Sequence, residues 1–145
     1  MQEVHLERDL PVPAEDVWAL LSDFGSIIKW LPSGNDNSTV VLTGEGVGMF
    51  RDLDMPSVGK VQHRLDRLDP DNMLITYSLT KGQPLGMVDY QMSVSVSPAG
   101  DGACRIKFYG EFEGDPTADI AQMAKNLEDS YRGMCDGLVA YIGAN

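Results

Sequence analysis

Basic residues are scarce in this chain of 145 residues. Eleven Lys and Arg stand against twenty-two Asp and Glu, so the formal net charge at pH 7 is −11. Proteins that bind nucleic acid without sequence preference neutralise its phosphates with a basic surface, and anionic membranes likewise attract positively charged surfaces. The charge balance therefore argues against a nucleic-acid partner and against docking to an anionic membrane surface.

Cysteine and histidine are also rare. Cys104 and Cys135 lie far apart without a Cys-x-x-Cys spacing, which argues against a disulfide framework or a cysteine-based zinc site. The two histidines, His5 and His63, form no His-Glu-x-x-His motif. We therefore expect neither a metal ion nor a cofactor.

Long apolar runs are missing as well. No stretch approaches the roughly 20 residues of a membrane span, so stable membrane insertion is not expected. Residues 1–9 lack the basic and apolar segments of a secretory signal, which makes the cytoplasm the expected location. Since no repeat or linker-like composition shift divides the chain, we expect residues 1–145 to form a single domain.

Alternation of apolar and polar residues is the main pattern that the chain does show. It predicts a strand near residues 4–10, and after two short helices, starting at Pro13 and near 27–31, it resumes and predicts six more strands. In residues 87–97 the inward positions are expected to be Val88, Tyr90, Met92, Val94 and Val96. The predicted strands after the helices are 39–43, 49–55, 60–68, 73–80, 87–97 and 104–113.

The last segment has a helical period instead. Asp115 is predicted to cap a helix with Pro116 at its first position, and the helix is expected to run to about residue 142. Gly133 and Gly137 lie off its apolar stripe, either as tolerated surface glycines or at a bend or a close neighbour. The stripe comprises Ile120, Met123, Ala124, Leu127, Tyr131, Met134, Cys135, Leu138 and Ile142.

The order of these elements predicts an α+β fold. A seven-stranded antiparallel sheet with one apolar face must curve around the only large apolar partner, which is the long C-terminal helix. A single helix does not fill the concave side of a long curved sheet. The remaining volume is therefore either a cavity or a space filled by large side chains.

Several segments of the chain resemble the SRPBCC superfamily of START-like, birch-pollen-allergen-type helix-grip domains. They are residues 13–24 (PAEDVWALLSDF), 29–32 (KWLP), the glycine-rich hairpin 44–51 (GEGVGMFR) and 65–69 (LDRLD), followed by the final helix. The resemblance implies a helix-grip fold over the whole chain. It also implies a role of the kind found among polyketide cyclases, lipid carriers and hormone receptors.

Two polar side chains are predicted to point inward. His63 shares a face with Val61 and Leu65, where it could act as an acid or base, bind a ligand, or be a neutral histidine satisfied by a neighbouring strand. Arg51 shares a face with Leu53, and a buried guanidinium needs an acceptor. That acceptor could be a ligand carboxylate or enolate or an internal carboxylate, unless Arg51 lies at the rim.

The other candidates combine bulk with a soft or hydrogen-bonding character. Tyrosines offer a ring and a hydroxyl, and methionines offer an adaptable lining, although both types are also ordinary core residues. No catalytic residue is assigned beyond His63 as a candidate. The residues expected to contact a ligand are Trp30, Arg51, His63, Tyr77, Tyr90, Met92, Phe108, Met123, Leu127 and Tyr131.

The function expected from these features is binding or transport of a small hydrophobic or amphipathic ligand in an internal cavity. One alternative is an enzyme resembling polyketide cyclases or dehydratases, with His63 and pocket tyrosines as acid–base groups. Another is a protein-interaction or regulatory module acting through the loops at 55–60 and 81–87, which are expected to border the cavity entrance together with the C-terminal helix. Several polar groups converging on the pocket floor would favour the enzyme, whereas a mostly apolar lining would favour a carrier.

Overall fold

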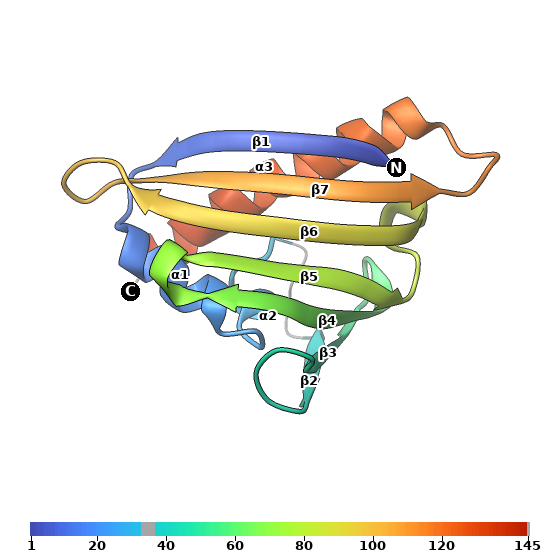
Figure 1. Ribbon diagram of the computed structural model, residues 1–145, viewed down its shortest axis with the longest axis horizontal. Helices are drawn as coiled ribbons and strands as arrows, with labels where there is room; N and C mark the ends of the chain where they lie inside the picture. The colour runs from blue at the N-terminus through green and yellow to red at the C-terminus, as the bar shows by residue number, and fades with distance from the viewer. Residues whose placement is uncertain (33–36, 145) are drawn as a thin grey trace.

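The computed structural model describes residues 1–32 and 37–144, which form one curved antiparallel sheet and three helices (Figure 1). The strand order of the 7-stranded sheet is β1-β7-β6-β5-β4-β3-β2. Short 3₁₀ turns at Pro70–Asn72 and Pro84–Gly86 connect β4 to β5 and β5 to β6. The elements are β1 (Gln2–Leu10), α1 (Ala14–Ser22), α2 (Ile27–Trp30), β2 (Thr39–Thr43), β3 (Phe50–Met55), β4 (Gly59–Asp69), β5 (Leu74–Lys81), β6 (Met87–Pro98), β7 (Cys104–Gly114) and α3 (Ile120–Gly143).

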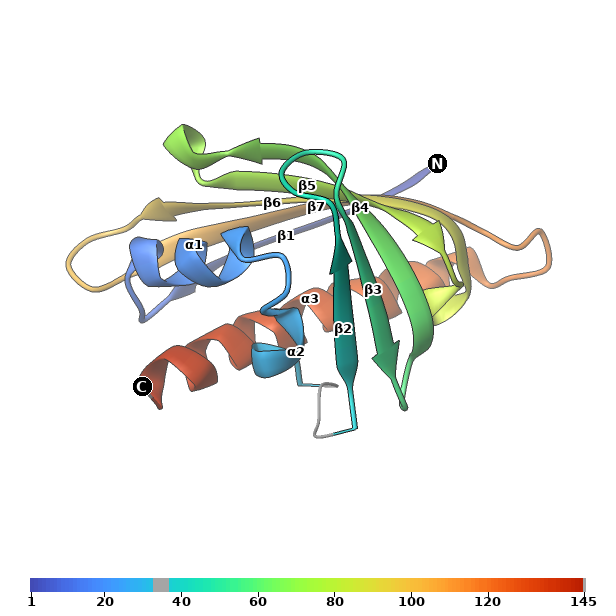
Figure 2. The same ribbon diagram turned by 90° about the horizontal axis from the view of Figure 1, so that it is seen from below.

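The sheet curves around α3, as the apolar pattern of the strands requires. Figure 2 shows β2 and β3 bending toward the side on which α3 lies, with α1 and α2 beside the C-terminal half of that helix. The predicted fold class, a seven-stranded antiparallel sheet wrapped around a long C-terminal helix, is confirmed. None of the described helices is long and apolar enough to cross a membrane.

Alternating residues of the central strands meet the apolar stripe of α3. Ile106 and Phe108 of β7 and Leu127 and Tyr131 of α3 are all buried. The rings of Phe108 and Tyr131 stack with centroids 4.7 Å apart and planes inclined by 14°. This layer fixes the helix against β7, so the concave space that is left lies toward β3, β4 and β5.

The long helix begins later than its sequence pattern predicts. Its cap is Asp119, whose carboxylate accepts a hydrogen bond from the Gln122 backbone N–H at 3.1 Å. The predicted cap, Asp115, instead accepts from the backbone N–H of Thr117 at 2.9 Å and so closes a local turn. An aspartate can satisfy either arrangement, and the prediction that it starts the helix was wrong.

The inward face of β6 is also shifted at its first residues. Val88 was predicted to point inward, but it is 45% exposed, while Met87 is only 3% exposed. The pairing with β7 shifts register between Met87 and Asp89, as in a β-bulge, which reverses the alternation at this point. From Tyr90 onward the predicted inward residues are buried.

The two helical glycines have different surroundings. A Cβ atom added to Gly137 would lie 2.0 Å from the Trp30 carbonyl oxygen, so only glycine allows α2 to approach α3 this closely. A Cβ atom on Gly133 would meet nothing closer than Pro32 Cγ at 3.7 Å, an ordinary contact. Of the sequence alternatives, a close neighbour therefore explains Gly137, and tolerance explains Gly133.

Candidate functional site

A cavity of about 150 Å³ lies between the concave side of the sheet, α2 and the middle of α3. Drug-sized ligands occupy larger pockets, of roughly 300–1,000 Å³, but a cavity of about 150 Å³ is sufficient for a benzene-sized molecule. Most of the lining is apolar. The lining residues are Ile27, Leu31, Leu53, Met55, Val58, Val61, His63, Tyr77, Pro84, Leu85, Met87, Tyr90, Leu127, Ser130, Tyr131 and Met134.

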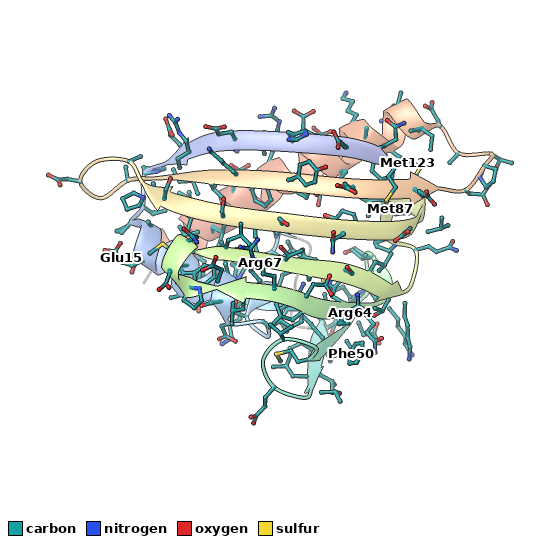
Figure 3. All side chains as sticks on the ribbon, viewed as in Figure 1. Glu15, Phe50, Arg64, Arg67, Met87 and Met123 are labelled. Atoms are coloured by element: carbon teal, nitrogen blue, oxygen red, sulfur yellow. The ribbon has the colours of Figure 1, made fainter. Side chains whose placement is uncertain are left out.

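Two connections border the cavity at the end of the molecule where β6 and α3 begin. Val58, in the β3–β4 turn, is 40% exposed, and Leu85, in the 3₁₀ turn before β6, is 46% exposed. Leu85 has a φ of +55°, a backbone conformation that residues other than glycine rarely adopt. Figure 3 labels Met87 and Met123 at this end, and of these two only Met87 lines the cavity.

The structure brings half of the predicted ligand-contacting residues to this cavity. All of the predicted residues are buried, but burial alone does not place a side chain against the open space. Those that line the cavity are His63, Tyr77, Tyr90, Leu127 and Tyr131.

The other predicted residues lie elsewhere in the interior. Trp30, Arg51 and Met92 border a separate void of about 10 Å³, which Tyr77 also borders. Phe108 and Met123 border neither space, because Phe108 packs its ring on Tyr131 and Met123 lies at the start of α3. Parity, the odd or even position of a residue in an alternating strand, identifies an inward face. It does not show which inward residues touch the cavity.

Sequence reasoning missed most of the apolar lining. Leu53 and Val61 share the inward faces of Arg51 and His63, so parity alone could have identified them. The contribution of α2 had no such signal, because it depends on how this helix packs over the end of the sheet. The 3₁₀ turn before β6 falls in the 81–87 loop, which the sequence places at the expected cavity entrance.

The polar feature beside the cavity is a pair of side chains from neighbouring strands. Arg51 on β3 is paired directly with His63 on β4. The Arg51 Nη2 atom lies 2.9 Å from His63 Nδ1, and Nη1 donates to the Phe24 carbonyl oxygen at 3.1 Å. The guanidinium also stacks over the rings of Phe24, at 4.0 Å, and Tyr77, at 4.7 Å.

This pairing determines where the His63 proton lies. A guanidinium has only donors, so His63 Nδ1 must accept with its lone pair, and a neutral imidazole then carries its proton on Nε2. Burial and the neighbouring Arg51 charge hold the pKa of His63 well below its ordinary value, which keeps the ring neutral at pH 7. No other described residue forms a hydrogen bond with the His63 ring.

Arg51 has no carboxylate partner among the described residues. Its side-chain contacts are a carbonyl oxygen, an imidazole and two aromatic rings, and its Nε atom is buried without a hydrogen-bond partner. The internal ion pair considered from the sequence is therefore absent from the described part of the chain. A rim position is excluded too, since Arg51 is 3% exposed.

A second polar pair lies deeper, between the sheet and α3. The hydroxyl oxygens of Tyr90 and Tyr131 are 2.6 Å apart, and burial raises the pKa of both phenols above the ordinary value. A Cβ atom on Gly110 would lie only 2.1 Å from the Tyr131 hydroxyl, so glycine at this position makes room for the pair. Because their pKa values are raised, both tyrosine hydroxyls are protonated at neutral pH.

The cavity thus has an apolar body with a few hydrogen-bonding groups. Its chemistry suits an apolar ring or branched chain that offers an acceptor to His63 Nε2–H. Within residues 1–32 and 37–144, no group of three or more His, Cys, Asp and Glu side chains is placed to hold a metal ion.

Comparison with known proteins agrees with this architecture. Residues 1–143 match the model of the family described as polyketide cyclase / dehydrase and lipid transport. MLP-like protein 423 of Arabidopsis thaliana is 31% identical over 119 residues, which cover 76% of this chain and 75% of that protein.

Solved structures show the same fold. Norcoclaurine synthase from Thalictrum flavum, in complex with dopamine and hydroxybenzaldehyde, aligns with a TM-score of 0.74 and 20% identity over 99% of this chain and 87% of that chain. XoxI from Bacillus cereus aligns with a TM-score of 0.81 and 21% identity over 98% of this chain and 96% of that chain. The chain therefore belongs to the polyketide cyclase / dehydrase and lipid transport family of the SRPBCC superfamily, whose members bind hydrophobic ligands.

Proposed function

We propose that this protein binds a small hydrophobic or amphipathic molecule in the cavity between the sheet and α3. The observation that carries the proposal is a space of about 150 Å³ lined mostly by apolar side chains, with its hydrogen-bonding groups few and fixed in position. Burial of apolar ligand surface drives such binding, and the polar groups orient the ligand. The family's association with hydrophobic ligands points the same way.

The proposed entrance lies between Val58, Leu85 and α3. Both side chains are apolar, exposed and carried on connections between strands. Connections of this kind move more readily than paired strands, so a ligand can enter when they separate. The exposed apolar side chains would then close over it.

The hydrogen bonding disfavours the enzymatic alternative. A general base needs an available lone pair, and the only lone pair of neutral His63 is already directed at Arg51. Burial raises the pKa values of Tyr77, Tyr90 and Tyr131, so these phenols stay protonated at neutral pH and no phenolate is present to accept a proton. These features support a carrier or sensor rather than proton-transfer chemistry.

The proposed location is the cytoplasm. Cys104 and Cys135 are free and buried, and thiols are kept reduced in that compartment.

The methionine methyl groups provide a direct test of the binding proposal. Met55, Met87 and Met134 line the cavity, whereas Met49 and Met73 lie outside it. With ¹³C-methyl methionine, titration with toluene should shift the signals of the three cavity residues in a saturable way. The signals of Met49 and Met73 should stay in place.

A matched pair of variants on α3 completes the test. Leu127→Phe places a ring in the cavity and should abolish the toluene-dependent shifts, while Ala121→Phe adds the same ring at an exposed position and should leave them intact. If wild-type protein shows no saturable shift, or equal shifts at all methionines, the proposal is wrong.

A further inference from the structure

We propose that the ligand is a carboxylic acid with a body the size of one ring, and that its carboxylate binds at His63 with the charge of Arg51 behind it. This inference rests on the proposed binding function and narrows it to one class of molecule. It is carried by three features of the described residues: a buried charge without an anion, a donor of fixed direction, and a small cavity.

The first feature is the uncompensated charge. A buried ion is normally paired, because removing it from water is costly unless an opposite charge or a full set of hydrogen bonds replaces the water. Arg51 has neither, since its Nε lacks a partner and no described carboxylate pairs with it. Asp23 borders the same small void, but it is exposed and forms no ion pair with Arg51.

The chain does not lack acidic residues that could fill this role. It contains twenty-two Asp and Glu, yet none of the ion pairs among the described residues, such as Arg105–Asp9 and Arg64–Asp66, involves Arg51. Among the described residues, nothing neutralises the Arg51 charge, so its positive potential is available to an anionic ligand.

The second feature is the direction of the donor. Arg51 donates a hydrogen bond to Nδ1 of His63, so the proton of the neutral imidazole is on Nε2. His63 itself lines the cavity. A ligand atom at this position must be a hydrogen-bond acceptor. Among acceptors of the same shape, a carboxylate gains more than an amide or ketone, because charge-assisted hydrogen bonds are the stronger ones and the Arg51 charge lies directly behind the ring.

The third feature is size. The cavity of about 150 Å³ takes a benzene-sized body, whereas the void beside Arg51, about 10 Å³, holds at most about one water molecule. The ligand therefore contacts His63 directly and reaches Arg51 through the imidazole or through one bridging water. Benzoate has the size and charge that this arrangement requires.

The experiment compares benzoate with benzamide, which has the same shape but no charge, and with toluene. Dissociation constants come from the methionine methyl signals at pH 7.5. Wild-type protein should bind benzoate at least about 10-fold more tightly than benzamide. Arg51→Met, which keeps an unbranched apolar side chain but removes the guanidinium and its charge, should lose the preference for benzoate over benzamide.

Two outcomes overturn the inference in different ways. If wild-type protein binds toluene but binds benzamide as well as benzoate, anion recognition is absent while hydrophobic binding stands. If neither toluene nor benzoate binds, the proposed function fails together with the inference.

A measurement on the wild type does not depend on whether a variant folds. Imidazole ¹⁵N NMR should show the His63 proton on Nε2 in the free protein, and benzoate should shift the Nε2 signal far more than benzamide does. A proton on Nδ1, or equal shifts with both compounds, contradicts the inference.

Discussion

At the level of single residues, Arg51 and His63 form a buried pair of unusual electrostatic character. The two side chains are both buried, and His63 faces Arg51 on one side and the ring of Tyr77 on the other, with ring centroids 4.6 Å apart. A protonated imidazole would place a second positive charge in this apolar surrounding. The folded protein consequently resists protonation of His63, whereas the unfolded chain does not.

The first prediction concerns stability below neutral pH. An unfolded histidine has a pKa of about 6.5, and that of folded His63 lies well below it, so the unfolded chain binds more protons between these values. The free energy of unfolding should fall as pH drops below about 6.5, by up to about 1.4 kcal/mol per pH unit from this group. Above that pH the group contributes no slope.

Chemical denaturation at pH 7.5 and 5.5 measures the effect. His63→Gln should lose less stability between these pH values than the wild type does. His5→Gln, which replaces an exposed histidine, should behave as the wild type. Parallel losses in wild type and His63→Gln would show that His63 is not held neutral.

The second prediction concerns the Tyr90–Tyr131 hydrogen bond. Removing either hydroxyl with Tyr90→Phe or Tyr131→Phe leaves the other buried without its partner and should cost about 1–2 kcal/mol. The double variant should cost little more than one single variant, since no unpaired hydroxyl remains. Urea denaturation of the four proteins gives the coupling energy, and strictly additive losses would contradict the pairing.

Parity predicted correctly that Arg51 and His63 are buried, but it did not predict that they pair. That pairing depends on the register of β3 against β4, where Arg51 lies opposite His63. Register follows from the geometry of the connecting turn, which the residue pattern leaves open. That no described carboxylate pairs with Arg51 depends on how all the packed elements meet, and it has no local sequence signal.

At the scale of elements, the contact between α2 and α3 depends on one glycine. The backbone of α2 passes so close to Gly137 that any side chain there must displace it, while Gly133 one turn earlier has room for a methyl group. Helix propensity favours alanine at both positions by about 1 kcal/mol. Packing opposes alanine only at Gly137, where the added methyl group would meet α2.

The third prediction uses this matched pair. Gly133→Ala should raise the free energy of unfolding by up to about 1 kcal/mol. Gly137→Ala should lower it by about 1–3 kcal/mol, because the added methyl group overpacks the crossing with α2. Thermal melts of the two variants against wild type give the signs, and equal effects would contradict the close approach at Gly137.

Element order and type were predictable because strand and helix periods differ and the chain keeps them apart. The boundaries that failed are those where a local hydrogen bond competes with the period. Asp115 closes a turn instead of capping α3, and the bulge at the start of β6 exchanges Met87 for Val88 on the inner face. The residue pattern decides neither case, because Asp115 and Asp119 can both cap a helix and Met87 and Val88 can both occupy an inward position.

Across the whole molecule, stability is expected to vary from the centre of the sheet to its edges. β6 is hydrogen-bonded on both sides, by β5 and β7, whereas β2 is paired on one side only and its residues are largely exposed. Amides that open locally exchange faster than those that require global unfolding. Backbone protection should therefore be lowest in β2 and highest in β6.

Hydrogen exchange followed by NMR tests this fourth prediction. Exchange in β6 should have the free energy and denaturant dependence of global unfolding, and exchange in β2 should be faster and insensitive to low denaturant. Equal protection in the two strands would show that the sheet opens as one unit.

The exposed edge at β2 has a consequence for solubility. The other edge strand, β1, carries several charged residues, but β2 reads Thr-Val-Val-Leu-Thr, with Val41 60% exposed. An uncharged, β-branched edge is a template for pairing between molecules, and at neutral pH the net charge of −11 opposes such encounters. Near the pI of about 4.3 this repulsion vanishes, so aggregation should begin at β2, and Val41→Lys should delay it by interrupting the edge.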